Sequence, residues 1–300
     1  MLPIKIELPD GFLEEEVRCD YTITKEMKKI WAVELDLLVE FERVCRKYNL
    51  RYFAYGGTLL GAIRHQGFIP WDDDIDVVML REDYDRFVEI AGKEFQHPYF
   101  FQTEDTDPFS SRGHAQIRNS LTTGILKSEE PFRLRFNQGI FLDVFVLDNV
   151  PEDEEERKKF YRKACDLKTK MVHFRNFSCK EMVKGSHGLN KLIKSILYPF
   201  FHDRKNPYYP KLHQFCSSLE GKTNVLGDCV YENRKPDMIY DPSIFESVES
   251  KPFEFIRIDV PKDYVKFLDI TFGDWHKFVK GTSDHGGVIF DTDRSYKCSI

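Results

Sequence analysis

The stretch that constrains this chain most is YGGTLLGAIRHQGFIPWDDDIDVVML, at residues 55–80. Its acidic run leads into apolar residues typical of a buried strand, which we predict at 74–80. Because side chains alternate across a strand, Asp74 and Asp76 are expected to project from one face. Carboxylates about 6–7 Å apart, at a rise of ~3.3 Å per residue, can share a divalent cation. The stretch therefore predicts a metal site, with Mg²⁺ as the first choice and Mn²⁺ as the alternative.

A glycine pair, Gly56 and Gly57, precedes Thr58 between a strand predicted at 51–55 and a helix predicted at 58–66. Glycine lets the backbone approach a phosphate closely, and a helix N-terminus offers unpaired N–H groups and a favourable dipole. A glycine turn alone is a weak signal. Followed by an acidic strand, it predicts a phosphate-binding turn that faces a metal site.

A third acid, Asp143, interrupts the apolar segment GIFLDVFVLD at 139–148. In a strand, Asp143 shares its face with Phe141 and Phe145. An ionised acid in such surroundings is unfavourable unless it is paired or bound to a metal. We predict that Asp143 is a third metal ligand; the alternative is a structural acid paired with an arginine.

The order of predicted elements indicates an α+β fold with a mixed sheet flanked by helices. Further helices are predicted at 24–48 and 82–93, and further strands at 99–102 and 114–118. Residues 152–221 are expected to be mostly helical, 225–260 strand-like, and 261–280 a final helix. We therefore predict three regions. These are a catalytic core at 1–150, a helical addition at 151–224, and a C-terminal extension at 225–300 that completes the acceptor side.

Composition excludes several classes of protein. A net charge of −6 gives no electrostatic basis for a nucleic-acid partner. Seven scattered cysteines without a C-x-x-C pair argue against a disulfide framework or a zinc ribbon, and favour reduced thiols. The charged start of the chain and the lack of an apolar run near ~20 residues predict no signal peptide and no membrane span. We expect a cytoplasmic protein.

One segment leaves two interpretations open. Residues 189–205, LNKLIKSILYPFFHDRK, mix apolar residues with Lys191, Lys194, Arg204 and Lys205. Such a helix can lie on an anionic membrane as a peripheral contact. The alternative, an amphipathic helix packed on the core, is the commoner arrangement.

The motif GGTLLGAIRHQGFIPWDDDIDV, with GIFLDVFVLD and FGDW further on, resembles the LicD family, which includes the fukutin-type proteins. The resemblance is strongest at 55–80 and 138–148. It implies the polymerase-β-type nucleotidyltransferase fold and a cytidine diphosphate donor. In the bacterial LicD branch, phosphocholine passes from CDP-choline to a sugar of a cell-surface glycan, such as lipopolysaccharide or teichoic acid, and CMP is released. Fukutin-type relatives transfer ribitol phosphate.

The resemblance also implies roles for individual residues. Gly57 and Thr58 would contact donor phosphates, Asp74 and Asp76 would hold magnesium, Asp143 would be the third acid, and Arg64 would be a phosphate clamp. After FGDW the chain reads HKFVKGTSDHGG, where the family more often has a methionine and prolines. No role is therefore predicted for His276 or His285.

Arg118 and Trp71 complete the mechanistic hypothesis, together with further roles for Arg64 and Asp143. Arg64 and Arg118 would neutralise phosphate oxygens, since arginine presents a fork of donors that matches them. Trp71, next to the acids, would contact the quaternary ammonium of choline, with simple packing as the alternative. Asp143 would accept the proton of the attacking hydroxyl. His65 and His114 are expected to be surface groups or satisfied core groups.

Two other functions stay open. In a true nucleotidyltransferase the hydroxyl would attack the α-phosphorus, and the nucleotide itself would be transferred. A catalytically silent nucleotide-binding protein could share the fold, although the three acids count against it. The partners we predict are a CDP-alcohol donor and a sugar or lipid-linked glycan acceptor. The transferred alcohol, the number of metal ions and the oligomeric state are left undetermined by the sequence.

Overall fold

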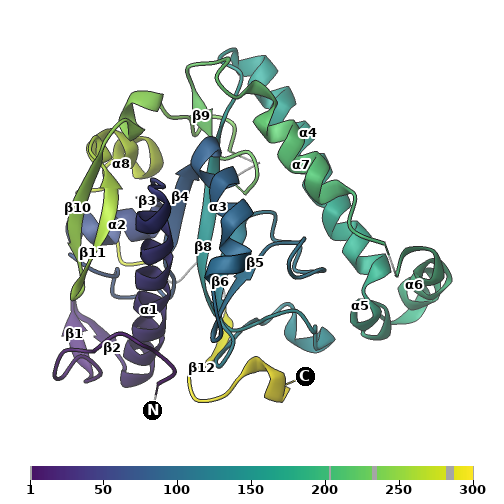
Figure 1. The fold of residues 1–300 in the computed structure, drawn as a ribbon, viewed down its shortest axis with the longest axis horizontal. Coiled ribbons are helices and arrows are strands. Elements are labelled where there is room, and N and C mark those ends of the chain that lie inside the picture. Colours follow the sequence, from purple (N-terminus) through teal and green to yellow (C-terminus); the bar gives the residue numbers. More distant parts are fainter. Residues whose placement is uncertain (1, 203, 232–234, 282–286, 300) are drawn as a thin grey trace.

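The computed structural model describes residues 2–202, 204–231, 235–281 and 287–299. Its centre is a mixed sheet in the order β3-β4-β8-β6-β5, with β9 paired to the end of β8 (Figure 1). The strands are β3 (Phe53–Ala54), β4 (Asp76–Leu80), β5 (Tyr99–Gln102), β6 (Ala115–Asn119), β8 (Ile140–Asn149) and β9 (Leu226–Gly227). Among the pairings of these described strands, only that of β4 with β8 is parallel, and it sets Asp76 directly opposite Asp143. The predicted α+β class is confirmed.

Helix α1 (Lys25–Tyr48) packs on β6 and β8 through its apolar face. Thr24 caps its first turn by accepting a hydrogen bond from the N–H of Met27, and Asn49 ends it in the left-handed conformation. Trp31, on the buried face, donates from Nε1 to the carbonyl of Asp72 at 3.0 Å. The helix thus supports the loop that carries the acidic run.

Two shorter helices complete the central part of the molecule. Helix α2 (Gly56–Arg64) follows β3, and α3 (Arg81–Glu94) follows β4. Both strands are short, and each helix begins within two residues of the end of its strand.

Beyond the sheet, the chain forms a helical arm, drawn at the right of Figure 1. It consists of α4 (Glu154–Ser178), α5 (Lys180–Lys184), α6 (Gly188–Phe201) and α7 (Tyr208–Cys216). Tyr161 and Leu167 of α4 join the main core. A separate small cluster of Leu134, Phe136, Cys179 and Met182 holds the far end. Among the described residues, no helix combines the length and the apolar composition that a membrane crossing requires.

The C-terminal part returns to the central sheet. It contains the hairpin β10 (Val248–Phe253) and β11 (Ile256–Pro261), then α8 (Tyr264–Phe272), which ends at Gly273 with φ +64°. Strand β12 (Val288–Asp291) pairs with β7 (Thr123–Leu126), and β1 (Glu16–Arg18) pairs with β2 (Tyr21–Ile23). One main core draws residues from 23 to 275, and the division into three regions stays a prediction.

Three details differ from the predicted ones. Strand β4 begins at Asp76 rather than Asp74; residues 72–75 form a connecting segment after a turn that Asp72 N–H closes on the carbonyl of Ile69 (2.8 Å). Helix α2 begins at Gly56 rather than at 58, so the glycines form its first turn. Within 189–205, the amphipathic helix α6 packs on α4 and α5 of the arm rather than on the main core, and none of its residues, all of them described, is fully buried.

Candidate active site

The predicted acids converge. Asp76 at the start of β4 lies opposite Asp143 of β8, and the preceding loop brings Asp72 and Asp74 to the same place. Burial first, and then the charges of Asp74, Asp143 and Asp72, raise the pKa of Asp76 well above its ordinary value. The carboxylate oxygens of Asp72, Asp73 and Asp74 also lie within 4.8 Å of one another. The site is therefore a concentration of negative charge that favours a cation.

A pocket of about 370 Å³ opens over these acids. One wall is acidic, and the remaining walls are mainly aromatic and aliphatic. The lining consists of Tyr55, Gly56, Gly57, Ile69, Trp71, Asp72, Asp74, Asp76, Phe145, Tyr231, Lys235, Met238, Thr271 and Phe272. Such a pocket suits a ligand with an anionic part that meets a cation and an apolar part that meets rings.

The glycine pair faces the acids, as the sequence predicts. A Cβ on Gly57 would lie 2.7 Å from Oδ2 of Asp72, and one on Gly56 would lie 3.7 Å from Oδ2 of Asp76. The first intrahelical bond of α2 runs from the N–H of Leu59 to the carbonyl of Tyr55, at 3.2 Å. The N–H groups before it belong to the open first turn, which favours anions.

Thr58 has a different contact from the one predicted for it. Its Oγ1 accepts a hydrogen bond from the backbone N–H of Asp76 at 2.8 Å, and its side chain is buried. This bond joins the first turn of α2 to the start of β4, so Thr58 fixes the distance between the glycine turn and the acid.

Asp143 is held by two neighbours, Gln116 of β6 and His114 just before that strand. His114 Nε2 lies 3.0 Å from Oδ1 of Asp143, and the Nε2 amide of Gln116 donates to the same oxygen. Burial lowers the pKa of His114 and outweighs the opposing effect of Asp143, which favours the neutral imidazole. Its Nδ1 is buried without a hydrogen-bond partner among the described residues. The predicted satisfied core histidine is thus a direct neighbour of an acid in the site.

Arg118 lies behind the site rather than in its pocket. It is almost fully buried, and it donates to Gln102 Oε1 (2.6 Å), Gly139 O (2.7 Å) and Gln116 Oε1 (2.6 Å). Burial lowers its pKa to about 9. Because Gln116 bridges Arg118 to Asp143, the guanidinium orients a neighbour of the acid and does not line the space above it.

The other predicted residues are distributed unevenly. Trp71 lines the pocket and meets Phe278 edge-on at 5.4 Å. Arg64 does not line it: Nη1 donates to the carbonyl of Trp275 at 3.1 Å and Nε donates to Nε2 of His65 at 3.0 Å. His276 stacks on Trp275 outside the pocket lining, and His285 lies outside the described residues.

Sequence reasoning missed several residues of the site, among them Asp72, Gln116, Phe145 and Tyr231, and two more have unusual surroundings. Glu34 of α1 is buried, and its Oε2 accepts no hydrogen bond from the described residues. Burial first, and then the charges of the four acids at 72–76, raise its pKa well above the ordinary value. Its position four residues after Ile30 on the inward stripe of α1 could have revealed it. Lys235 lines the pocket from an irregular segment, and no sequence signal points to it.

The acids present fit a magnesium ion. Magnesium takes oxygen ligands from a few carboxylates and leaves places for substrate phosphate. Oδ1 of Asp76 is shielded from solvent and has no hydrogen-bond partner among the described residues, which suits an oxygen that ligates a metal ion. Asp74, Asp76 and Asp143 are the residues that would hold it.

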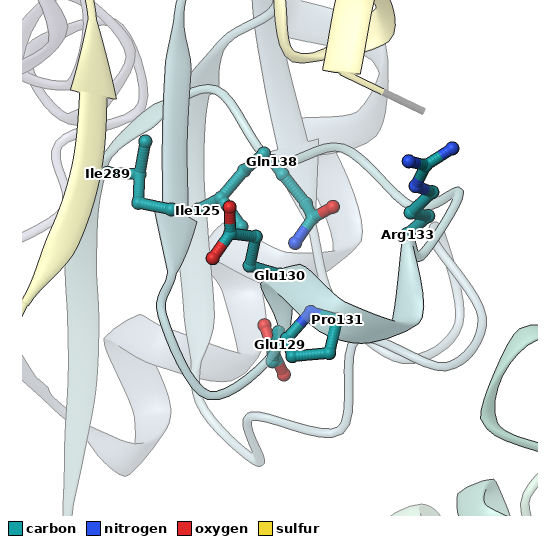
Figure 2. Close-up of a pocket in the computed structure, with 7 residues that line it drawn as sticks. All are labelled: Ile125, Glu129, Glu130, Pro131, Arg133, Gln138 and Ile289. Atoms are coloured by element: carbon teal, nitrogen blue, oxygen red, sulfur yellow. The ribbon is translucent and has the colours of Figure 1, made fainter. Parts of the chain in front are cut away.

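A second pocket, of about 340 Å³, contains none of these acids (Figure 2). It is lined by Ile125, Glu129, Glu130, Pro131, Arg133, Gln138 and Ile289. Glu129 is engaged with Arg112 and Arg175, which lower its pKa despite burial. The pocket therefore offers neither a cluster of free acids nor a glycine turn, and the acid pocket is the candidate active site.

This site on this sheet defines a protein of the nucleotidyltransferase type, and comparison with known proteins agrees. Residues 49–118 match the LicD/FKTN/FKRP nucleotidyltransferase domain. The chain is 31% identical to lipopolysaccharide cholinephosphotransferase LicD of Haemophilus influenzae over 258 residues, which are 84% of this chain and 93% of that protein. The chain belongs to the LicD family of phosphotransferases.

Two more distant relatives match shorter stretches. Ribitol 5-phosphate transferase FKRP of Homo sapiens is 44% identical over 46 residues, 15% of this chain and 9% of that protein. The uncharacterized protein RP689 of Rickettsia prowazekii is 30% identical over 116 residues, 39% of each chain.

Proposed function

We propose that this protein transfers phosphocholine from CDP-choline to a hydroxyl of a cell-surface glycan in a Mg²⁺-dependent reaction that releases CMP. The observation that carries the proposal is the register of the central sheet, which sets Asp76 opposite Asp143 beside the glycine turn of α2. The resemblance to a cholinephosphotransferase over 84% of the chain supports the same reaction.

Each residue of the site has a role in this reaction. Bound magnesium would neutralise the charge that builds up on the diphosphate. Asp74 and Asp76, with Asp143 as the third ligand, would hold it, and the open first turn of α2 would bind phosphate oxygens. Asp143, oriented by His114 and Gln116, would take the proton of the attacking hydroxyl as the bond to CMP breaks.

The aromatic walls of the pocket support choline as the transferred alcohol. Phe145 and Tyr231 lie side by side with ring centroids 4.5 Å apart, and Trp71 and Tyr55 line the same space. A quaternary ammonium has no N–H to donate and is recognised by ring faces, whereas ribitol and glycerol need hydrogen-bonding groups. Lys235 would then serve the phosphates at the other end of the donor.

The proposal includes a cytoplasmic location and a sugar or lipid-linked glycan as acceptor. Nucleotidyl transfer stays the second candidate, because the same acids and glycine turn would serve attack on the α-phosphorus. The two reactions differ in what leaves: CMP in the first, and a phosphorylated alcohol in the second.

The test is incubation with CDP-choline, CDP-ribitol or CDP-glycerol, a glycan acceptor and Mg²⁺, with products separated by chromatography. We expect CMP and phosphocholine-labelled glycan from CDP-choline, and loss of both with a chelator. Asp76→Asn should abolish turnover, while the matched surface change Asp166→Asn, at an exposed ion pair with Lys170, should not. Glycan that carries CMP, or full activity of Asp76→Asn, would overturn the proposal.

A further inference from the structure

Helix α6 presents an apolar face to solvent. Its members share one side of the helix because they are spaced at i, i+3, i+4, i+7 and i+11. They are Leu189, Leu192, Ile193, Ile196 and Phe200, which are 71, 57, 42, 59 and 65% exposed. We call them the α6 stripe. A contiguous exposed apolar face of this kind is typical of an interaction surface.

The stripe is not the face that attaches α6 to the arm. That face consists of the partly buried residues Lys194, Leu197, Tyr198 and Phe201. Phe201 meets Phe174 of α4 edge-on at 5.7 Å, and Lys194 Nζ donates to Ser186 Oγ at 2.8 Å. The helix is therefore already attached through one side, and the stripe on the other side does not contribute to its packing on the arm.

The charge around the α6 stripe indicates which kind of surface it binds. Residues 182–202 include three lysines and no aspartate or glutamate, although the chain has 50 acidic residues among 300 and a net charge of −6. An apolar face in an acid-free, basic segment complements an anionic lipid surface. The field of such a surface reaches about 8 Å at physiological salt, comparable to the helix diameter of about 10 Å, so lysines on the flanks and back contribute.

The geometry fits a helix that lies on a bilayer. Fourteen residues at 1.5 Å each make α6 about 21 Å long, too short to cross a ~30 Å hydrocarbon core. The helix sits at the outer end of the arm, away from the central sheet (Figure 1). We propose that the α6 stripe docks the protein on an anionic bilayer surface, with its apolar side chains inserted at the headgroup boundary. This docking does not depend on the reaction proposed above.

The test is co-sedimentation of the full chain with vesicles of equal parts phosphatidylglycerol and phosphatidylcholine, and with vesicles of phosphatidylcholine alone. We expect binding to the anionic vesicles that weakens as salt is added. The double change Leu192→Asp and Ile196→Asp should reduce the affinity at least about ten-fold. The matched change Val265→Asp and Ile270→Asp alters α8 residues that are 46 and 42% exposed, and should leave binding unchanged.

Two further measurements keep the outcome decisive. Leu192→Ser with Ile196→Ser removes the apolar area without adding charge, and circular dichroism checks that each variant folds. Light scattering checks the alternative occupant, a second copy of the chain. The proposal is overturned if the native protein does not pellet with anionic vesicles, or if the α8 pair loses binding equally. It is also overturned if the stripe proves to be a dimer interface and vesicles do not compete with the dimer.

Discussion

The residue that most clearly links chemistry to stability is Asp76. Burial and three neighbouring acids raise its pKa, so its ionised form is disfavoured in the folded protein. As pH rises past the ordinary value of 3.8, the unfolded chain releases the proton while the folded chain retains it, and stability falls. A bound cation reverses this penalty. The site should therefore destabilise the metal-free protein.

Asp76→Asn is accordingly expected to raise the free energy of unfolding of the metal-free protein by about 1–3 kcal/mol at neutral pH. The same change should abolish the rise in melting temperature that Mg²⁺ gives the native protein. Thermal melts with and without the ion measure both effects, with Asp166→Asn as the surface control. A variant that melts lower without metal, or that still responds to Mg²⁺, contradicts the assignment.

Tyr231 carries the second prediction at this scale. Its ring lies next to Phe145 in the pocket and is partly exposed, so its removal leaves the fold intact. Tyr231→Ala should reduce kcat/KM for CDP-choline by about 2- to 30-fold, the range expected for one cation–π contact. CDP-glycerol, which has no cation, should be affected much less, and Tyr231→Phe should behave like the native protein. An equal loss for both donors would argue against ring recognition of choline.

The sequence predicts the surroundings of a residue well only where its neighbours in the chain determine those surroundings. The alternation of side chains sufficed for Asp76 and Asp143, because each strand fixes its own faces. Arg118 shows the limit. Arg118 shares a face with Gln116 on β6. Whether its guanidinium is exposed to solvent or donates to the carbonyl of Gly139 depends on a segment 21 residues further along the chain. Charge alone therefore predicted a phosphate ligand where the structure has a buried support.

At the level of elements, local signals located most helices and strands. Thr24 and Asn49 mark the ends of α1, and the predicted strand at 99–102 matches β5. The start of α2 was predicted two residues late, because the glycine pair suggested a turn where it begins a helix. Strands β7 and β12 were not predicted: each is only four residues long, and their pairing joins segments about 165 residues apart. Nothing local in the chain specifies such a pairing.

Helix α7 yields a prediction on pH. His213, on α7, lies with Nε2 2.8 Å from the carbonyl of Gly113, which requires an N–H there, and with Nδ1 3.2 Å from Nη1 of Arg81. Burial and the charge of Arg81 lower the pKa of His213 to about 3. As the pH falls below 6.5, the ordinary pKa of histidine, His213 becomes protonated in the unfolded chain but stays neutral in the folded chain. The free energy of unfolding therefore decreases as the pH is lowered.

Between pH 7 and pH 5, His213 is expected to lower the free energy of unfolding by about 2 kcal/mol. His213→Gln, which can still donate to Gly113, should flatten the dependence over this interval by close to one proton. Denaturant unfolding of both proteins at several pH values measures the difference in slope. Parallel curves would show that His213 is protonated in the folded state after all.

At the scale of the whole molecule, the arm contributes to two hydrophobic clusters of very different size. Its base shares the main core through Tyr161 and Leu167, whereas its tip depends on the small cluster around Phe136. Stability is not uniform in such an arrangement, and a small cluster opens at a lower free energy than a large one. We therefore expect the site, built on β4 and β8, to lie in the more stable part, and the α6 stripe in the less stable part.

This difference between the two clusters predicts which amides lose protection when a core side chain is truncated. Phe136→Ala removes a buried ring, a change that costs about 3–5 kcal/mol in a fully coupled core. Because Phe136 belongs to the small cluster, the loss should appear as faster amide exchange in α5 and α6, while amides of α1 and β8 keep their protection. Phe87→Ala, in the main core, is the matched control and should speed exchange throughout. If Phe136→Ala also speeds exchange in β8 as Phe87→Ala does, the arm and the sheet unfold as one unit.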